Sequence, residues 1–108
     1  MLFRSKLSFT MKATSAAAGT RDRAIVGVVG SGNLEVLIER RLPADICRID
    51  VATAAHGFAA VWEAVIEDFV TRRPAGGLHI SINDGGARPD MVSLRLAQGV
   101  RLLEERES

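Results

Sequence analysis

Apolar and polar residues alternate along the chain between positions 23 and 51, and this alternation predicts three strands. A period of two residues puts successive side chains on opposite faces, so one face of each strand is buried. The first two strands are expected at 23–29 and 34–40, and the third at 47–51. The second of these segments also fits a helix that ends before Pro43, and the pattern alone leaves that alternative open.

A four-residue break, Gly30-Ser31-Gly32-Asn33, separates the first two predicted strands. Glycine and asparagine tolerate positive φ at little steric cost, so this break is typical of the turn of a β-hairpin. In that arrangement Ser31 lies at the tip, with no bulky neighbour on either side. Serine is also common in turns for hydrogen-bonding reasons alone, and Asn33 would serve equally well as the cap of a helical second segment.

After residue 57 the spacing of apolar residues lengthens to three and four, which predicts a helix over residues 58–72. Arg72 near its end suits the negative pole of the helix dipole, and Pro74 ends it. Burial of its aromatic side chains contributes about 2–3 kcal/mol each, so we expect this helix to anchor the core. The predicted apolar stripe consists of Phe58, Val61, Trp62, Val65, Ile66 and Phe69.

The rest of the pattern completes the fold. Leu7 to Met11 alternate as an edge strand, residues 78–82 alternate as a further strand, and Pro89 suits the first position of a final helix. We therefore predict an α+β fold, with a mostly antiparallel sheet of about five strands and two helices packed on one face. The strand–helix–strand step between residues 47 and 83 predicts one parallel pair of strands.

Length and charge limit the class of protein. The chain has 108 residues, which suits one compact domain; we expect a basic N-terminal extension at 1–22, with an edge strand at 7–13, and a single domain at 23–104. Fourteen basic and thirteen acidic residues give a net charge of +1, which argues against binding nucleic acid or a membrane surface through bulk charge. No apolar run in the sequence approaches the roughly 20 residues that span a bilayer.

Metal and nucleophile chemistry are not expected. The single cysteine, Cys47, cannot form an internal disulfide and fits a reducing cytoplasm. His56, His79 and Cys47 are isolated from one another and lack the spacing of metal ligands. Catalysis by Ser31 would need a histidine base, and the predicted hairpin lacks the strand-to-helix elbow of hydrolases. We therefore predict no catalytic residue in this chain.

Covalent modification of Ser31 is the hypothesis that remains. Gly27, Gly30 and Gly32 stand in the reverse order to the dinucleotide-binding fingerprint, and the Walker lysine is absent from the sequence. A phosphodiester needs an unhindered hydroxyl and an approachable backbone, and the flanking glycines supply both. Asn33 would then contact a modifying transferase or orient the attached group, although asparagine is also an ordinary turn residue.

Four blocks of sequence, taken together and in this order, are specific, although no single one is decisive. They are Val26-Gly27-Val28-Val29-Gly30-Ser31-Gly32-Asn33-Leu34-Glu35-Val36-Leu37, Gly57-Phe58 with Val61-Trp62-Glu63-Ala64-Val65, Ile80-Ser81-Ile82-Asn83-Asp84-Gly85-Gly86-Ala87, and Val92-Ser93-Leu94-Arg95-Leu96. In these blocks the chain resembles the malonate decarboxylase acyl carrier protein family, the small delta subunit of that complex. The resemblance covers roughly residues 7–103.

The resemblance implies that residues 23–104 form a carrier domain and that Ser31 matches the family's attachment serine. It implies a covalently attached 2'-(5''-phosphoribosyl)-3'-dephospho-CoA, whose thiol holds acetyl and malonyl thioesters, with Gly30, Gly32 and Asn33 flanking the attachment point. It also implies the partners: an acyltransferase subunit that exchanges acetyl for malonyl, decarboxylase subunits that release carbon dioxide, and a prosthetic-group transferase. The whole complex would convert malonate to acetate.

Two positions depart from the family pattern. Asn33 stands where aspartate is frequent, which removes a charge beside the attachment site. Arg88 stands where a small hydroxyl residue is expected before Pro89, which predicts a poorly capped final helix. Two alternatives stay open: an unmodified structural or interaction subunit of a larger enzyme complex, and a small module that binds a nucleotide non-covalently at the glycines.

Overall fold

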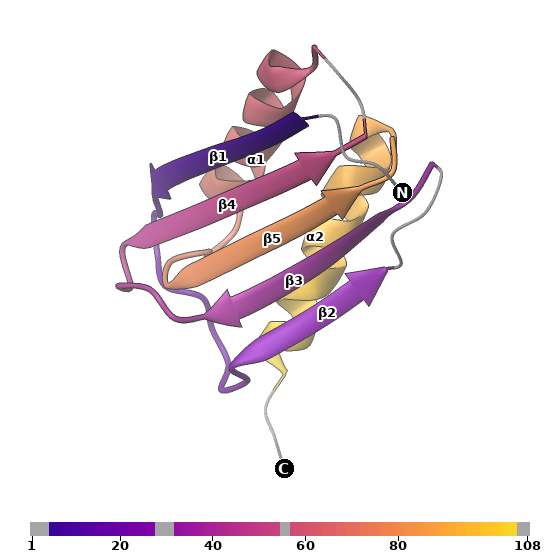
Figure 1. The fold of residues 1–108 in the computed structure, drawn as a ribbon. Coiled ribbons are helices and arrows are strands. Elements are labelled where there is room, and N and C mark those ends of the chain that lie inside the picture. The colour runs from indigo at the N-terminus through magenta and orange to yellow at the C-terminus, as the bar shows by residue number, and fades with distance from the viewer. Residues whose placement is uncertain (1–4, 28–31, 55–56, 106–108) are drawn as a thin grey trace.

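A computed structural model of the chain describes residues 5–27, 32–54 and 57–105. In this part of the chain five strands form one sheet in the order β1-β4-β5-β3-β2, and two helices cover one of its faces (Figure 1). β4 and β5 are parallel, whereas the other neighbouring pairs are antiparallel, so the predicted α+β fold and the predicted parallel pair are confirmed. The elements are β1 (Ser5–Lys12), β2 (Arg23–Gly27), β3 (Leu34–Arg40), β4 (Ile46–Thr53), α1 (Ala59–Arg72), β5 (Leu78–Asp84) and α2 (Pro89–Glu104).

β2 and β3 are antiparallel neighbours, as the predicted hairpin requires, and their register pairs Gly27 with Glu35. The second segment is a strand and not a helix. Leu34, Val36 and Ile38 are fully buried on one face of β3, which lies between β2 and β5. Alternating aliphatic side chains fill such a half-buried pleated surface, whereas a helix would spread them around its circumference.

The face of the sheet that lies toward the helices is aliphatic and holds the core. α2 packs over β2 and β3 and approaches them closely at Gly99, where a Cβ atom would lie 2.6 Å from Cδ1 of Ile38. A larger residue at this position would require the end of the Ile38 side chain to shift. The buried side chains of the sheet face are Leu34, Val36, Ile38, Cys47, Ile49, Val51, Leu78, Ile80 and Ile82, and α2 adds Val92, Leu96, Val100 and Leu103.

The start of α2 agrees with two predictions. Pro89 occupies the first turn of the helix, where its missing N–H is no loss. Arg88 is the N-cap residue and makes no side-chain capping hydrogen bond, as the substitution before the proline predicted. The carbonyl oxygen of Arg88 accepts hydrogen bonds from the N–H groups of Met91 and Val92, so the first turn closes through the backbone.

The buried face of α1 is shifted from the predicted stripe. The helix begins at Ala59, Phe58 is its N-cap residue, and the side chains of Phe58 and Val61 are 53% and 42% exposed. The prediction that Phe58 anchors the core is therefore wrong, because the first turn faces the loop before α2 instead of a strand. The residues that α1 buries are Trp62, Ile66, Phe69 and Val70.

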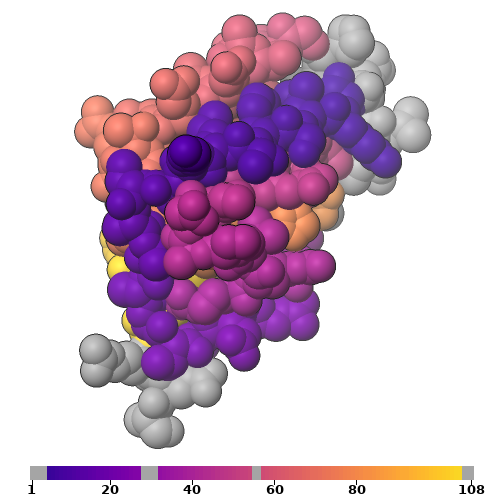
Figure 2. Space-filling model, turned by 90° about the vertical axis from the view of Figure 1, so that its left-hand side faces the viewer, coloured from indigo at the N-terminus to yellow at the C-terminus, as the bar shows by residue number. Residues whose placement is uncertain are grey.

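Residues 13–22 cross one end of the sheet from β1 to β2. Figure 2 shows this connection, coloured indigo to purple, running down the side of the molecule. The guanidinium group of Arg40 in β3 holds it by donating to the carbonyl oxygens of Ala17, Ala18 and Arg21 at 2.7–3.0 Å. This end of the sheet is covered, and Gly32 lies at the other end. Neither of the described helices has the length and apolar character needed to cross a membrane.

Candidate functional site

The predicted attachment turn directly precedes β3, at the end of the sheet opposite the 13–22 connection. Ser31 and Gly30 lie outside the described residues, whereas Gly32 and Asn33 lie inside them. The N–H of Gly32 donates to the carbonyl oxygen of Gly85 at 2.9 Å, and the N–H of Gly85 donates to the carbonyl oxygen of Asn33 at 2.7 Å. This pair of hydrogen bonds fixes the residues that follow Ser31 to the loop between β5 and α2.

Gly27 and Gly32 bracket the 28–31 segment, and both have positive φ, +83° and +74°. At Gly27 a Cβ atom would lie 2.3 Å from the carbonyl oxygen of Leu34, so a glycine is required there. Around Gly32 the described atoms leave open space within 4 Å of a Cβ position, apart from its chain neighbours. Asn33 acts as a turn residue, since its Oδ1 accepts the N–H of Leu34 at 2.8 Å. The backbone at Gly32 is therefore approachable from outside.

Arg95 of α2 lies beside Gly27 and is a residue that sequence reasoning missed as part of the site. Its Cδ would lie 3.5 Å from a Cβ atom at Gly27, and its Nη1 donates to Oε1 of Gln98 at 2.9 Å. Its Nε is buried and has no hydrogen-bond partner among the described residues. Nε of Arg21 is in the same situation, but its guanidinium group pairs with Glu105 near the covered end. An unpaired buried donor costs about 1–3 kcal/mol, which an anionic ligand at Arg95 would recover.

An apolar groove lies beside this edge, between the first turns of α1 and the loop that leads into α2. Its volume is about 320 Å³. Asp84 lies at its base with both carboxylate oxygens engaged, because Oδ1 accepts the N–H of Ala87 at 2.8 Å and Oδ2 accepts the hydroxyl of Thr53 at 2.7 Å. This buried acid therefore holds the loop in place. The apolar groove is lined chiefly by Phe58, Val61, Trp62, Val65, Pro89 and Val92.

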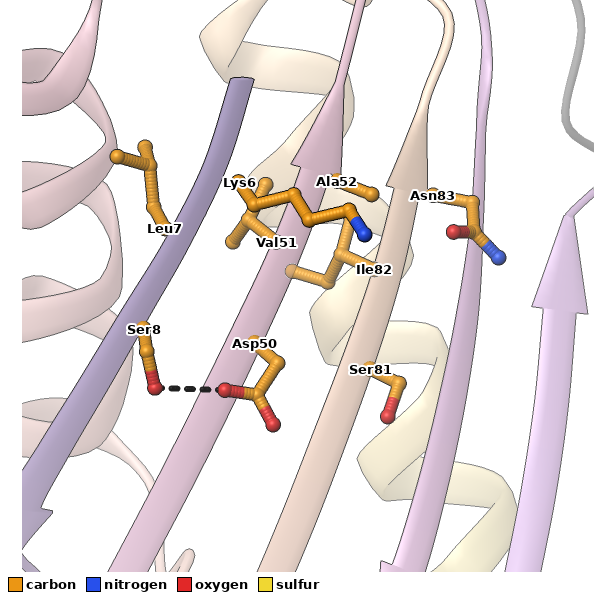
Figure 3. A pocket seen from close by; sticks show the side chains of 9 residues that line it. All are labelled: Lys6, Leu7, Ser8, Asp50, Val51, Ala52, Ser81, Ile82 and Asn83. Atoms are coloured by element: carbon orange, nitrogen blue, oxygen red, sulfur yellow. Dashed lines mark hydrogen bonds between the residues drawn. The ribbon is translucent and has the colours of Figure 1, made fainter. Parts of the chain in front are cut away.

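A polar cluster on the open face of the sheet is the second place where side chains gather. The hydroxyl of Ser8 donates to Oδ1 of Asp50 at 2.6 Å (Figure 3), and Nε2 of His79 lies 2.7 Å from Oδ2 of Asp50. Burial of Asp50 opposes its ionisation, but the hydrogen bonds from Ser8 and His79 and the charge of Arg48 outweigh it. The pKa of this carboxyl group is therefore below its ordinary value.

This cluster does not have the geometry of a catalytic nucleophile. Ser8 donates to the carboxylate of Asp50 and not to the imidazole of His79, so the histidine base of a serine nucleophile is not in place. His79 lies on the polar face of its strand, β5. The cluster as a whole was missed, because the three residues come from β1, β4 and β5, and their contact depends on the strand order. Their alternation with apolar residues was the only signal in the sequence.

The described residues offer no metal site and no reactive thiol. His, Cys, Asp and Glu side chains in the described ranges form no group that could hold a metal ion, and His56 lies outside these ranges. Cys47 is fully buried, and burial raises the pKa of its thiol to about 12. Since the thiolate is the reactive form, Cys47 is inert at neutral pH.

Known proteins resemble this chain along most of its length. The family model described as the malonate decarboxylase delta subunit (MdcD) matches residues 21–103. The malonate decarboxylase acyl carrier protein of Bradyrhizobium diazoefficiens is 63% identical over 99 residues, which cover 92% of this chain and 94% of that protein. The protein of the same name from Xanthomonas axonopodis pv. citri is 53% identical over 83 residues, 77% of this chain and 79% of its own.

A solved structure shares the fold. One chain in the crystal structure of a Pseudomonas malonate decarboxylase hetero-tetramer in complex with malonate superimposes with a TM-score of 0.81 and 38% sequence identity. The match covers 93% of this chain and 99% of that chain. The structural match therefore covers more of this chain than residues 21–103, which the family model matches.

Proposed function

This chain belongs to the malonate decarboxylase acyl carrier protein family, as the four sequence blocks predicted, and we propose that its Ser31 carries the prosthetic group. It is an acyl carrier subunit of a malonate decarboxylase. The group we propose is 2'-(5''-phosphoribosyl)-3'-dephospho-CoA, joined to the Ser31 hydroxyl through a phosphodiester. The observation that carries this proposal is the family match over residues 21–103, a span that includes the predicted turn.

The described residues around the turn fit a phosphate-linked group. The Nε of Arg95 is a buried cationic donor that has no partner within residues 5–27, 32–54 and 57–105, and the Arg95 side chain lies beside Gly27, directly before the 28–31 segment. Charge-assisted hydrogen bonds to phosphate are the strong use of a guanidinium group. The open space within 4 Å of a Cβ position at Gly32, measured on the described atoms, is compatible with the approach of a transferase.

Each part of the chain then has a separate task. When bound, the group supplies a thiol that forms acetyl and malonyl thioesters, and a thioester stabilises the carbanion of decarboxylation better than free malonate does. Arg95 holds the phosphate, and the hydrogen bonds between Gly32, Asn33 and Gly85 keep the attachment point fixed to the domain. The chain contributes no catalytic residue in this proposal, and the satisfied geometry of the Ser8–Asp50 pair is compatible with that.

The partners we propose are the acyltransferase and decarboxylase subunits of the complex and a prosthetic-group transferase. The solved relative is part of a malonate decarboxylase hetero-tetramer, which supports assembly with other subunits. We propose the cytoplasm as the compartment, and the free Cys47 thiol is compatible with it.

Intact-protein mass spectrometry with peptide mapping tests the proposal on chain that is co-expressed with its cognate attachment enzymes. We expect a mass increase equal to the dephospho-CoA derivative, located on the peptide that contains Ser31, and no increase in Ser31→Ala. A chain that stays unmodified while a known family member is modified under the same conditions would favour the unmodified interaction subunit. Modification that persists in Ser31→Ala would place the attachment elsewhere.

A further inference from the structure

We propose that the apolar groove between α1 and the loop before α2 is the resting seat of the pantetheine end of the attached group. This inference rests on the proposed attachment at Ser31 and goes beyond it, because it assigns a binding site on the carrier domain itself. The thiol and its acyl thioester lie against Val61 and Trp62 when the group is not engaged with a partner subunit.

The location of the apolar groove is the first argument. Gly85 forms hydrogen bonds with both Gly32 and Asn33, and the next residue, Gly86, already lines the apolar groove. The chain beside Ser31 and the rim of the apolar groove are thus joined through one loop. A long arm tethered at this edge meets the apolar groove at a high effective concentration, without the loss of translational freedom that a free ligand incurs.

The size of the apolar groove determines which part of the group it can take. Pockets for small ligands commonly measure about 300–1,000 Å³, and the apolar groove, at about 320 Å³, lies at the lower limit of this range. It has room for the slender pantetheine portion and not for the whole group. The ribose units and adenine therefore stay outside, near the attachment point.

The chemistry of the apolar groove matches this portion. Phe58 and Val61 expose about half of their apolar side chains at its rim, although the sequence pattern predicted them to be buried. The geminal methyl groups and the ethylene spacers of pantetheine would cover this surface, and each buried methylene contributes about 0.8 kcal/mol in general. Both oxygens of the Asp84 carboxylate already accept hydrogen bonds, from Thr53 and Ala87, so the ligand does not need to supply a donor to them.

Among the described residues that line the apolar groove, Arg88 is the one cation, and it matches the charge of the remainder of the group. Arg88 lines the apolar groove, and its Nε lies 3.4 Å from Oδ1 of Asp90, with both side chains largely exposed to solvent. Such an exposed pair contributes little, so Arg88 is free to exchange Asp90 for a stronger anion. The diphosphate that precedes pantetheine supplies that anion just outside the apolar part. Seating of the arm in this way protects the thioester from water between transfers.

Alkylation of the arm's thiol by iodoacetamide tests this inference on the modified full-length chain. The assay reports the arm alone, because Cys47 is fully buried and the pKa of its thiol is about 12. Val61→Ser removes apolar contact from the apolar groove, and we expect alkylation to become about fourfold faster, as for the loss of one buried methylene. Leu94→Ser is the matched control, since Leu94 is 49% exposed on α2, outside the apolar groove, and its rate should not change.

A second measurement avoids any change in the apolar groove. Trp62 is the only tryptophan of the chain, so its indole N–H gives a single NMR resonance. We expect this resonance to shift between unmodified Ser31→Ala and the modified native chain. Equal alkylation rates for Val61→Ser and Leu94→Ser, or an unshifted Trp62 resonance in chain whose mass confirms attachment at Ser31, would overturn the seat and leave the proposed function intact. If the mass spectrum shows no attachment at Ser31, both the proposed seat and the proposed function are contradicted.

Discussion

Two cavities have the same volume, about 320 Å³ each, but they differ in how much bonding capacity and apolar surface their side chains leave unused. The cavity on the open sheet face is bordered by Asp50, whose carboxylate is bonded to both Ser8 and His79. The apolar groove at the turn edge has half-exposed Phe58 and Val61 on its rim. Volume therefore does not separate a binding site from a surface hollow.

What separates the two regions is unused bonding capacity. At the turn edge the Nε of Arg95 lacks a partner among the described residues, and apolar side chains remain in contact with water. Both are costs that a ligand would remove. On the open face the carboxylate of Asp50 already has its partners, Ser8 and His79, so a ligand would have to displace them there. We therefore propose that the function lies at the turn edge, and three paired substitutions and one pH dependence test that proposal.

The largest effect is expected from comparing the serines of the two regions. Ser31→Ala should abolish attachment of the prosthetic group and keep the fold, because the hydroxyl that forms the phosphodiester is gone. Ser8→Ala should keep full attachment, because its hydroxyl is already bonded to Asp50. Intact mass after co-expression with the attachment enzymes measures both, and circular dichroism checks the fold. Loss of attachment in Ser8→Ala would move the site to the open face.

The two aspartates should differ in their contribution to stability. Asp84→Ala leaves the N–H of Ala87 and the hydroxyl of Thr53 without this acceptor in a buried place, so the free energy of unfolding should fall by about 2–3 kcal/mol. Asp50→Ala should lower it by only about 0.5–1 kcal/mol, because Asp50 is partly exposed and solvent screens its charge. Urea denaturation of both variants gives the comparison, and equal losses would contradict it.

The two arginines should differ in the rate of attachment. Arg95→Gln should slow transfer of the group to Ser31 about tenfold, the effect of losing one charge-assisted hydrogen bond to phosphate. Arg48→Gln on the open face should leave the rate unchanged. Arg95→Lys should recover part of the rate, since the positive charge is kept, which a purely structural role would not predict. Initial rates from intact mass, with melting temperatures as the control for folding, decide the question.

The smallest effect concerns the pH dependence of the open face. The pKa of Asp50 in the folded chain is below its ordinary value of 3.8, so its charge stabilises the fold at pH values above 3.8. That contribution should disappear as the pH falls through the lower pKa of the folded state. The difference in unfolding free energy between the native chain and Asp50→Asn, about 0.5 kcal/mol at neutral pH, should shrink toward zero in acid. A difference that persists at pH values below the pKa of Asp50 would contradict the assigned hydrogen bonds.

Local pattern predicted the elements and the fold class of this protein. The alternation in residues 34–40 and 47–51 sets which faces of β3 and β4 are buried, and neighbouring segments such as β2 and β3 pair because a short connection brings them together. The residues of the turn were also accessible to sequence reasoning, since Gly32 has the positive φ that its residue type favours. The role of Ser31 stays a prediction that came from the family resemblance.

Tertiary structure alone decided which distant residues share a site. Ser8 and Asp50 are 42 residues apart and meet because β1 pairs with β4, a choice that the two-residue period does not encode. Arg95 lies beside Gly27 because α2 packs over β2 and β3, and this packing is not encoded by the local pattern either. Periodicity identifies the apolar face of an element but not the extent of the surface beneath it. The surface beneath α1 does not cover its first turn, so the side chains of that turn stay exposed and form the rim of the apolar groove.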